Sequence, residues 1–219
     1  TAGVMYLFDN GISPYVSYSE SFLPVSGRDG YQRPYVPEEG QQTEVGVKYT
    51  PEGFNGYASA ALFNLEQKNV KTTDPKNPNL TIQAGEARSR GLELEFSGEV
   101  YTGLTLTANY TYNEVETTKS GSVGEVGKRL PGLPEQIVSG WATYAFNGKL
   151  EGLSIGSGVR YVGSSYGDIA NSADMKVPAY TLWDAMIAYD FSKDWRLQVN
   201  ATNLTNREYV SACNYWCYY

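Results

Sequence analysis

The residues of this chain that could do chemistry are two cysteines and several groups of carboxylates, because the sequence contains no histidine. Without histidine, the usual Ser-His and Asp-His arrangements of hydrolases cannot be built. Asp9, Asp168, Asp184 and Asp190 show no spacing that suggests a metal cage. The sequence therefore predicts no catalytic residue, no metal ligand and no enzymatic activity.

The two cysteines, Cys213 and Cys217, are separated by three residues. Two thiols could bind a metal or form a disulfide, but a zinc site usually needs four ligands and no histidine is present to complete one. We therefore expect a disulfide. Closing so short a loop removes only about 2 kcal/mol of chain entropy, so its expected role is to hold Asn214, Tyr215 and Trp216 at a fixed place.

Three carboxylates occupy alternating positions in two strand-like stretches. Glu44 alternates with Val45 and Val47, and Glu93 and Glu95 alternate with leucines. Because a β-strand sends successive side chains to opposite faces, these carboxylates should lie on a polar face. One interpretation is the wet wall of a channel. The other is that they face an enclosed domain. Each enclosed carboxylate would then need a paired cation, because losing one partner of a buried pair costs about 3 to 5 kcal/mol.

The elements that position these residues are strands with regular alternation of apolar and polar side chains. The clearest runs from Leu104 to Tyr112, with Thr105, Thr107, Asn109 and Thr111 on the other face. A soluble sandwich would tolerate such strands, but here they repeat at even spacing. We predict ten strands, near residues 1–8, 12–22, 40–50, 56–70, 81–99, 104–116, 134–146, 152–165, 178–191 and 195–210.

The connections between these strands alternate in length. Short turns rich in Gly, Asn, Asp, Ser and Pro are expected at 9–11, 51–55, 100–103, 147–151 and 192–194, and long polar loops at 23–39, 71–80, 117–133 and 166–177. Short turns at one rim and long loops at the other are typical of an outer-membrane barrel, whereas a sandwich or propeller would mix them. The expected fold is therefore all-β, a transmembrane antiparallel β-barrel.

Composition agrees with a membrane environment. The chain has 219 residues, of which 19 are Tyr, a residue that favours the membrane-water interface. We assign eight aromatic residues near strand ends to interfacial girdles: Tyr6, Tyr18, Tyr49, Tyr57, Tyr112, Trp183, Tyr189 and Trp195. The net charge of -7 argues against a nucleic-acid partner, which would need a basic surface.

Both ends of the predicted strand order lie on the long-loop side. Bacterial barrels normally begin and end in the periplasm and close into a ring without free edges. We therefore expect residues 1–219 to be a segment of a larger barrel, with an odd number of strands before it and at least one after it.

Several stretches, spread along the whole chain, carry a family resemblance: Gly3 to Phe22 (GVMYLFDNGISPYVSYSESF), Thr43 to Tyr49 (TEVGVKY), Arg88 to Glu95 (RSRGLELE), Arg160 to Asp168 (RYVGSSYGD) and Asn203 to Ser211 (NLTNREYVS). Together with the Cys213 to Cys217 loop, they resemble TonB-dependent siderophore receptors of the ferrichrome and ferric-hydroxamate branch. The resemblance implies a 22-stranded barrel around an N-terminal plug domain, multi-pass in the bacterial outer membrane. Residues 1–219 would be its C-terminal part, without the plug, the first half of the barrel or the final strand.

The resemblance also implies roles for individual residues. Glu44 and Glu93 match barrel glutamates that contact arginines of the plug. The matching cysteines are bridged, and the loop between them supplies an aromatic ligand contact; because Asn214 follows the first cysteine here, Trp216 or Tyr215 is the better candidate. The alternative is that Trp216 only packs against a neighbouring loop.

The function implied is binding and active import of ferric hydroxamate siderophores, with energy from TonB, ExbB and ExbD acting through the plug. Iron would enter as an Fe(III)-siderophore chelate, and no cofactor would be bound by this chain itself. Further partners would be the remaining barrel strands, the lipopolysaccharide of the outer membrane, and phages or bacteriocins at the long loops. Arg88 and Arg90 are candidates for lipopolysaccharide phosphates, with a solvated rim as the alternative. The alternative function is a passive outer-membrane channel or an adhesion or phage-receptor barrel.

Overall fold

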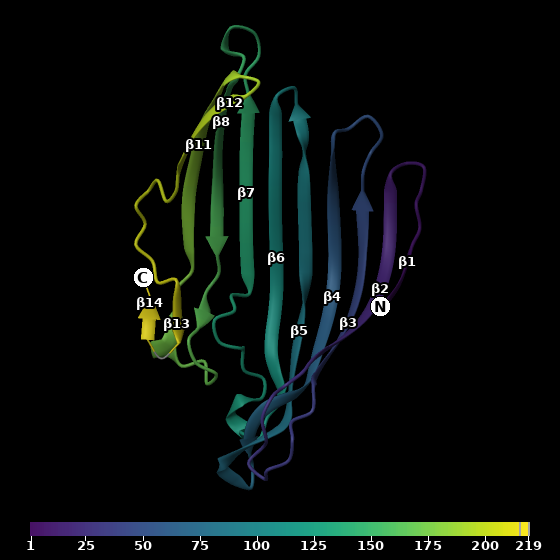
Figure 1. Ribbon diagram of the computed structural model, residues 1–219, viewed down its shortest axis with the longest axis vertical. Coiled ribbons are helices and arrows are strands. Elements are labelled where there is room, and N and C mark those ends of the chain that lie inside the picture. Colours follow the sequence, from purple (N-terminus) through teal and green to yellow (C-terminus); the bar gives the residue numbers. More distant parts are fainter. Residues whose placement is uncertain (215, 219) are drawn as a thin grey trace.

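The structure, a computed structural model, describes residues 1–214 and 216–218, and at residues 123, 214, 216 and 218 it describes the backbone alone. Ten strands form one antiparallel sheet in which each strand pairs with its neighbours in the order β1-β2-β3-β4-β5-β6-β7-β8-β11-β12 (Figure 1). Their bounds are Ala2–Met5 (β1), Ile12–Leu23 (β2), Glu38–Tyr49 (β3), Gly56–Asp74 (β4), Asn77–Tyr101 (β5), Leu104–Lys119 (β6), Gln136–Ala145 (β7), Leu153–Val162 (β8), Tyr180–Ser192 (β11) and Trp195–Ala201 (β12).

The remaining elements lie at the long-loop end or in short turns. Two small hairpins pair β9 (Ser165–Tyr166) with β10 (Lys176–Val177) and β13 (Ala212–Asn214) with β14 (Trp216–Tyr218). Three single 3-10 turns are η1 (Val123–Glu125), η2 (Gly148–Leu150) and η3 (Ala173–Met175). In the part of the chain that the structure describes, no helix has the length and apolar character needed to cross a membrane.

The ten predicted strands are confirmed, but two predicted boundaries are wrong. The loop expected at 71–80 is instead a continuation of the β4-β5 hairpin, whose pairing runs to Asp74 opposite Asn77. β12 ends at Ala201 rather than near residue 210, because Asn203 and Asn206 adopt positive φ angles of 53° and 49° and close a turn. A strand cannot continue through that left-handed backbone.

The register separates the sheet into two faces. Val45 pairs with Leu62 and Leu62 with Leu92, so these apolar residues share what we call the outer face. Val45 and Leu62 are 54% and 56% exposed, although both are large and apolar. Apolar residues in such a row need an apolar environment, and membrane lipid supplies it. The opposite face, which carries Glu44 and Glu93, is called the inner face.

Aromatic pairs mark the short-turn end of the outer face. Tyr6 packs edge-on against Phe8, Tyr144 against Phe146, and Tyr189 against Phe191, with ring centroids 4.6, 4.8 and 4.9 Å apart. Each pair precedes a short turn, as expected of an interfacial girdle. One girdle assignment is wrong: Tyr57 pairs with Ser97 on the inner face and donates a hydrogen bond to Glu95.

At its long-loop end, the β4-β5 hairpin is held by contacts with the loop between β2 and β3. Gly30 donates its backbone N–H to the carbonyl of Thr81 at 2.7 Å, and the Tyr31 hydroxyl donates a hydrogen bond to the Asp74 carboxylate. The hydrogen bond from Tyr31 is the largest cause that holds the pKa of Asp74 below its ordinary value of 3.8. The hairpin and this loop therefore form one packed unit at the long-loop end.

Candidate functional site

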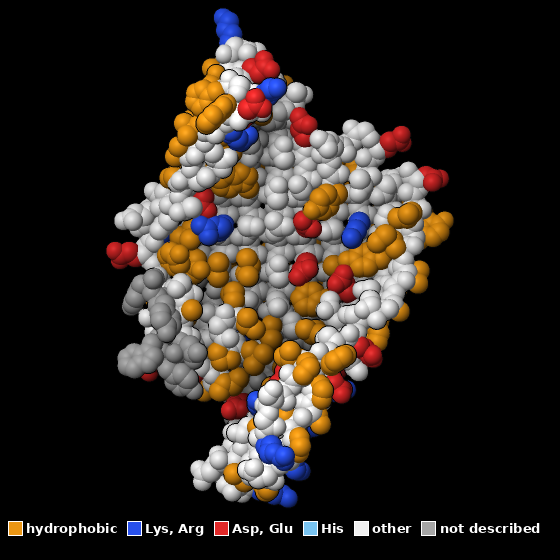
Figure 2. Space-filling model, in the orientation of Figure 1, with side chains coloured by type: hydrophobic (Ala, Val, Ile, Leu, Met, Phe, Trp, Pro, Cys, Tyr) orange, Lys and Arg blue, Asp and Glu red, His pale blue; other side chains and the backbone are white. Residues whose placement is uncertain are grey.

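Glu44 on β3 and Glu93 and Glu95 on β5 lie on the inner face, as the alternation predicted. The structure brings them together in the lining of one acidic hollow. The hollow has a volume of about 410 Å³. Figure 2 shows acidic side chains gathered near the middle of this face, with a basic side chain beside them. The hollow is lined by Tyr15, Glu44, Lys48, Ser59, Ala61, Glu93, Leu94, Glu95, Asn109 and Thr111.

Tyrosine hydroxyls hold two of the three carboxylates. The Tyr15 hydroxyl donates to Glu44 Oε1 at 2.6 Å, and the Tyr57 hydroxyl donates to Glu95 Oε1 at 2.5 Å. Gln42 Nε2 donates to the second Glu44 oxygen at 3.2 Å. Within the described residues, the Glu93 carboxylate makes no hydrogen bond or ion pair.

The charge of this hollow is not balanced from within. Lys48 is the single basic residue of its lining, and its ammonium lies 5.7 Å from the Tyr15 ring centroid instead of pairing with a carboxylate. Seven carboxylates elsewhere among the described residues do form ion pairs: Asp29 with Arg33, Glu116 with Arg88, Glu114 with Arg90, Glu86 with Lys119, Glu135 with Arg129, Asp184 with Arg160 and Asp190 with Arg196. The hollow is therefore suited to a cationic group from outside this chain.

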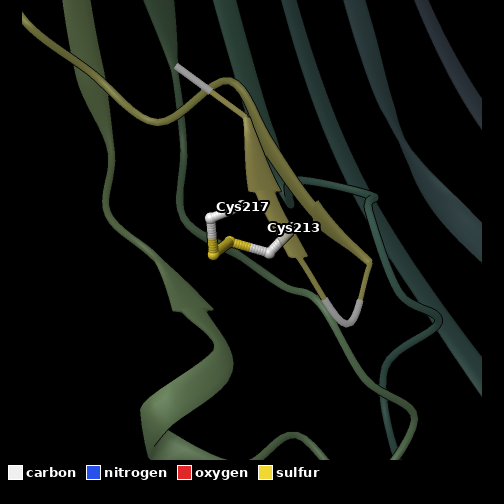
Figure 3. Close-up of a disulfide and its surroundings, with 2 residues drawn as sticks. All are labelled: Cys213 and Cys217. Carbon is white, nitrogen blue, oxygen red and sulfur yellow. A yellow bond between two sulfur atoms is a disulfide. The ribbon is translucent and has the colours of Figure 1, made fainter.

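The predicted disulfide is confirmed: Cys213 and Cys217 face each other across the β13-β14 hairpin and are bonded, with Cα atoms 4.0 Å apart (Figure 3). Cys213 is 4% exposed. Tyr215 lies outside the described residues, and the side chain of Trp216 does too, so their ligand-binding role stays a prediction.

A glycine fixes the position of this hairpin. A Cβ atom added at Gly167 would lie 2.6 Å from the Cys213 Cβ and 2.8 Å from its carbonyl oxygen. Only a residue without a side chain allows this approach. Gly167 follows β9 and donates its N–H to the Met175 carbonyl at 2.8 Å, so the β9-β10 hairpin supports the disulfide hairpin directly.

Arg129 joins the two loops beside the disulfide hairpin, a role that no sequence pattern indicated. Its Nη2 donates to the Ser164 carbonyl at 3.0 Å, and its guanidinium lies 5.4 Å from the Tyr166 ring centroid. Asn171 bonds both backbone groups of Arg129, at 2.8 and 2.9 Å. These partners lie 35 or more residues away in sequence, so no local pattern could have revealed them.

A second unpredicted network anchors the turn that follows β12. Arg160 forms a bidentate pair with Asp184, at 2.6 and 3.1 Å, on the inner face. Asp184 is 8% exposed, and its Oδ1 also accepts the backbone N–H of Asn203 at 2.9 Å. The Asn203 side chain in turn bonds both backbone groups of Arg207. The segment leading to the disulfide hairpin is therefore tied to the sheet.

On the outer face, the two arginines considered for lipopolysaccharide pair across β5 and β6. Arg88 pairs with Glu116, and Arg90 Nη2 lies 2.9 Å from Glu114 Oε2. Both pairs lie on the same face as Leu92, two and four residues closer to the long-loop end of β5. Whether they contact lipopolysaccharide phosphates or solvent stays a prediction.

Comparison with known proteins is consistent with this geometry. Residues 1–204 match the family described as TonB dependent receptor-like, beta-barrel. The chain is 40% identical, over 99% of its length, to the ferrichrome outer membrane transporter/phage receptor of Escherichia coli, and 41% identical, over its whole length, to the ferrioxamine B receptor of Salmonella typhimurium. It also superposes on the crystal structure of the siderophore receptor PiuA from Acinetobacter baumannii with a TM-score of 0.83 and 29% identity, over 99% of this chain and 33% of that one.

The chain spans about a third of the length of the curated relatives it matches, 30% of the ferrichrome transporter and 32% of the ferrioxamine B receptor. The match nevertheless covers nearly the whole of this chain and includes every strand of the ten-stranded sheet. This chain therefore belongs to the family of TonB-dependent receptor β-barrels.

Proposed function

We propose that this chain is part of an outer-membrane receptor that binds ferric hydroxamate siderophores and imports them with energy from TonB. The observation that carries the proposal is the identity of about 40%, over essentially the whole chain, to receptors named for ferrichrome and ferrioxamine B. Both of these ligands are hydroxamates. Iron is cargo in this function, carried as an Fe(III) chelate, and no cofactor is assigned to the chain.

In this function the acidic hollow is the seat of the plug domain. Glu44 and Glu93 would pair with plug arginines, and the unbalanced charge of the hollow supports that role. Tyr15 and Gln42 hold the Glu44 carboxylate ready for such a partner, whereas Glu93 has no partner within the described residues. Because ion pairs of this kind can be exchanged for other contacts, they can seat the plug and still release when TonB, ExbB and ExbD act on it.

The disulfide hairpin would form part of the ligand mouth. Trp216 and Tyr215 are the proposed ligand contacts, presented at a position that the Cys213–Cys217 bond and the close approach of Gly167 fix. A neutral chelate offers little charge to grip, so aromatic faces and hydroxyl groups suit it.

The test is iron uptake by the full-length receptor in a strain that lacks its own hydroxamate receptors. Cells should accumulate radioactive iron from ferrichrome or ferrioxamine B when TonB is present and lose that uptake when it is deleted. A ferric catecholate serves as the mismatched ligand. Uptake that persists without TonB would favour the passive channel, and uptake of the catecholate alone would refute the hydroxamate class.

A second proposed role is recognition by phages or bacteriocins at the long-loop end. One relative is named both as a ferrichrome transporter and as a phage receptor, and a related pyoverdine receptor has been solved with pyocin S2. The surrounding lipid would be lipopolysaccharide. Phage adsorption to cells that express the full-length receptor, compared with cells that lack it, tests this role.

A further inference from the structure

Two tyrosines stack at the long-loop end of the inner face. The rings of Tyr180, at the start of β11, and Tyr209, after β12, have centroids 4.2 Å apart and planes inclined by 29°. Tyr180 pairs with Val162 and Val162 with Ile137. Continuing across the sheet, Ile137 pairs with Thr111, which pairs with Glu93. The stack therefore lies on the same face as the acidic hollow.

A cavity of about 610 Å³ opens beside this stack. It lies between the residues that enter β11 and the segment that leads to the disulfide hairpin, and most of its surface is apolar. Its size is within the range of about 300 to 1,000 Å³ found for small-molecule sites. The lining residues are Pro178, Ala179, Tyr180, Arg207, Glu208, Tyr209 and Val210.

The hydroxyl groups of this stack are free to donate. Tyr15, Tyr18, Tyr31 and Tyr57 each donate to a carboxylate. By contrast, neither Tyr180 nor Tyr209 makes a hydrogen bond through its hydroxyl to any described residue, although both side chains are half-buried. Neither hydroxyl is among the buried, unpartnered polar atoms of the described residues, so both are accessible to a ligand that brings hydrogen-bond acceptors.

The stack is also held in place before any ligand arrives. Asn203, which caps the turn before Tyr209, is bonded to Asp184, and Asp184 to Arg160. Leu204 donates its N–H to the Trp183 carbonyl at 2.8 Å. A site that is ordered in advance loses less entropy on binding.

We propose that this cavity is a ligand subsite of the mouth, in which the Tyr180–Tyr209 pair contacts the Fe(III) hydroxamate chelate. The inference rests on the proposed function and adds to it two described residues that the sequence did not suggest. The ring faces contact the apolar backbone of the chelate, and the two hydroxyls donate to its carbonyl and hydroxamate oxygens.

The experiment measures ferrichrome and ferrioxamine B binding to the purified full-length receptor in detergent. Tyr209→Ala removes ring and hydroxyl and should raise the Kd about tenfold. Tyr180→Phe and Tyr209→Phe keep the stack and should each raise it about threefold, the range of one hydrogen bond. Tyr189→Ala is the matched control, because Tyr189 lies on the same strand but on the outer face at the short-turn end.

Folding is checked in every variant by heat-modifiable migration on gels. Wild-type affinity in a folded Tyr209→Ala receptor would overturn the inference. Loss in the alanine variant with wild-type affinity in both phenylalanine variants would support ring contact and refute donation by the hydroxyls.

These outcomes are separate from failure of the proposed function. If the wild-type receptor bound neither hydroxamate chelate, the proposed function would fall and this inference with it. If the wild-type receptor bound and imported them while Tyr209→Ala did so equally well, only the subsite would be refuted.

Discussion

At the scale of single residues, the tyrosine hydroxyls and carboxylates of the inner face divide into satisfied and open groups. Glu44 and Glu95 are held by Tyr15 and Tyr57, whereas Glu93 is an exposed carboxylate on the wall between them. A carboxylate held by a neighbouring hydroxyl keeps its direction when its cationic partner leaves. In the proposed function, Glu93 would depend on a plug arginine alone, so it should be the most sensitive reporter of plug seating.

We therefore predict that Glu93→Gln loosens the plug in the full-length receptor. Removing the Glu93 charge would leave the enclosed plug arginine without its counter-charge, at a cost of about 3 to 5 kcal/mol. The plug should therefore open at a lower urea concentration. The measurement is conductance of the receptor in planar bilayers during a urea titration. Glu114→Gln is the control, since it removes the same charge from the outer face, where Glu114 pairs with Arg90. Equal urea midpoints for the two variants would contradict a plug contact at Glu93.

An arginine added to the outer face should destabilise the receptor more than one added to the inner face. Leu62→Arg places a charge on the outer face, several residues from the short-turn end, and should destabilise the folded receptor by about 2 to 4 kcal/mol. Gln198→Arg places it on the inner face but outside the acidic hollow and should cost little. Urea unfolding in lipid vesicles, followed by tryptophan fluorescence, gives both values. Similar destabilisation by the two changes would refute the assignment of the faces.

At the scale of elements, the long-loop end is a set of hairpins fitted to one another rather than a group of independent loops. The β9-β10 hairpin supports the disulfide hairpin through Gly167, and Arg129 ties the loop after β6 to the same support. The β4-β5 hairpin is bracketed in the same way by the loop between β2 and β3. A change at one contact should therefore be felt in the neighbouring hairpin.

Gly167→Ala should displace the disulfide hairpin, because the new Cβ would lie 2.6 Å from that of Cys213. We expect the affinity of the full-length receptor for ferrichrome to fall about three- to tenfold, because the hairpin would be displaced but its ligand contacts would not be removed. Gly124→Ala is the control, since no atom lies within 4 Å of its Cβ position. Unchanged affinity in a folded Gly167→Ala receptor would show that the hairpin takes no part in binding.

The contact between Tyr31 and Asp74 should make the packing of the β4-β5 hairpin sensitive to acid. Because the pKa of Asp74 is lowered in the folded state, its contribution is complete well above 3.8 and is lost as the pH falls through the lower folded value. The Gly30 amide, which bonds Thr81, should lose protection from hydrogen exchange as the pH falls below about 4, after correction for intrinsic rates. The Ala145 amide at the other end of the sheet should not, and Asp74→Asn should abolish the pH dependence.

At the scale of the whole molecule, what the sequence could predict was local and periodic. The ten strands and their two faces follow from alternation with period two, which each strand carries by itself. Tyr57 was assigned to the wrong face because a tyrosine near a strand end suits an interface and a hydrogen bond to Glu95 equally well. The end of β12 was missed because two asparagines adopt a left-handed backbone, and the Arg129 contacts because they depend on tertiary structure.

The sheet also predicts how residues 1–219 behave by themselves. β1 and β12 lie at opposite ends of the strand order, so each has one edge without a partner in the described sheet. Unpaired strand edges are not tolerated in lipid. Refolded in detergent, this polypeptide should aggregate or stay heterogeneous in size-exclusion chromatography, whereas the full-length receptor should be monodisperse. A uniform, heat-modifiable monomer of residues 1–219 would contradict the prediction.

The Tyr–Phe pairs at the short turns mark one membrane interface, and strand lengths measured from them give the distance that each hairpin extends beyond the membrane. β7 and β8 have 10 residues each, about the length that crosses the hydrocarbon, whereas β5 has 25. At roughly 3.3 Å per residue, the excess length of β5 is on the order of 50 Å along the strand. The tip of the β4-β5 hairpin therefore lies far beyond the long-loop ends of β7 and β8. In the proposed receptor, a phage fibre would be able to bind this tip at a distance from the ligand mouth.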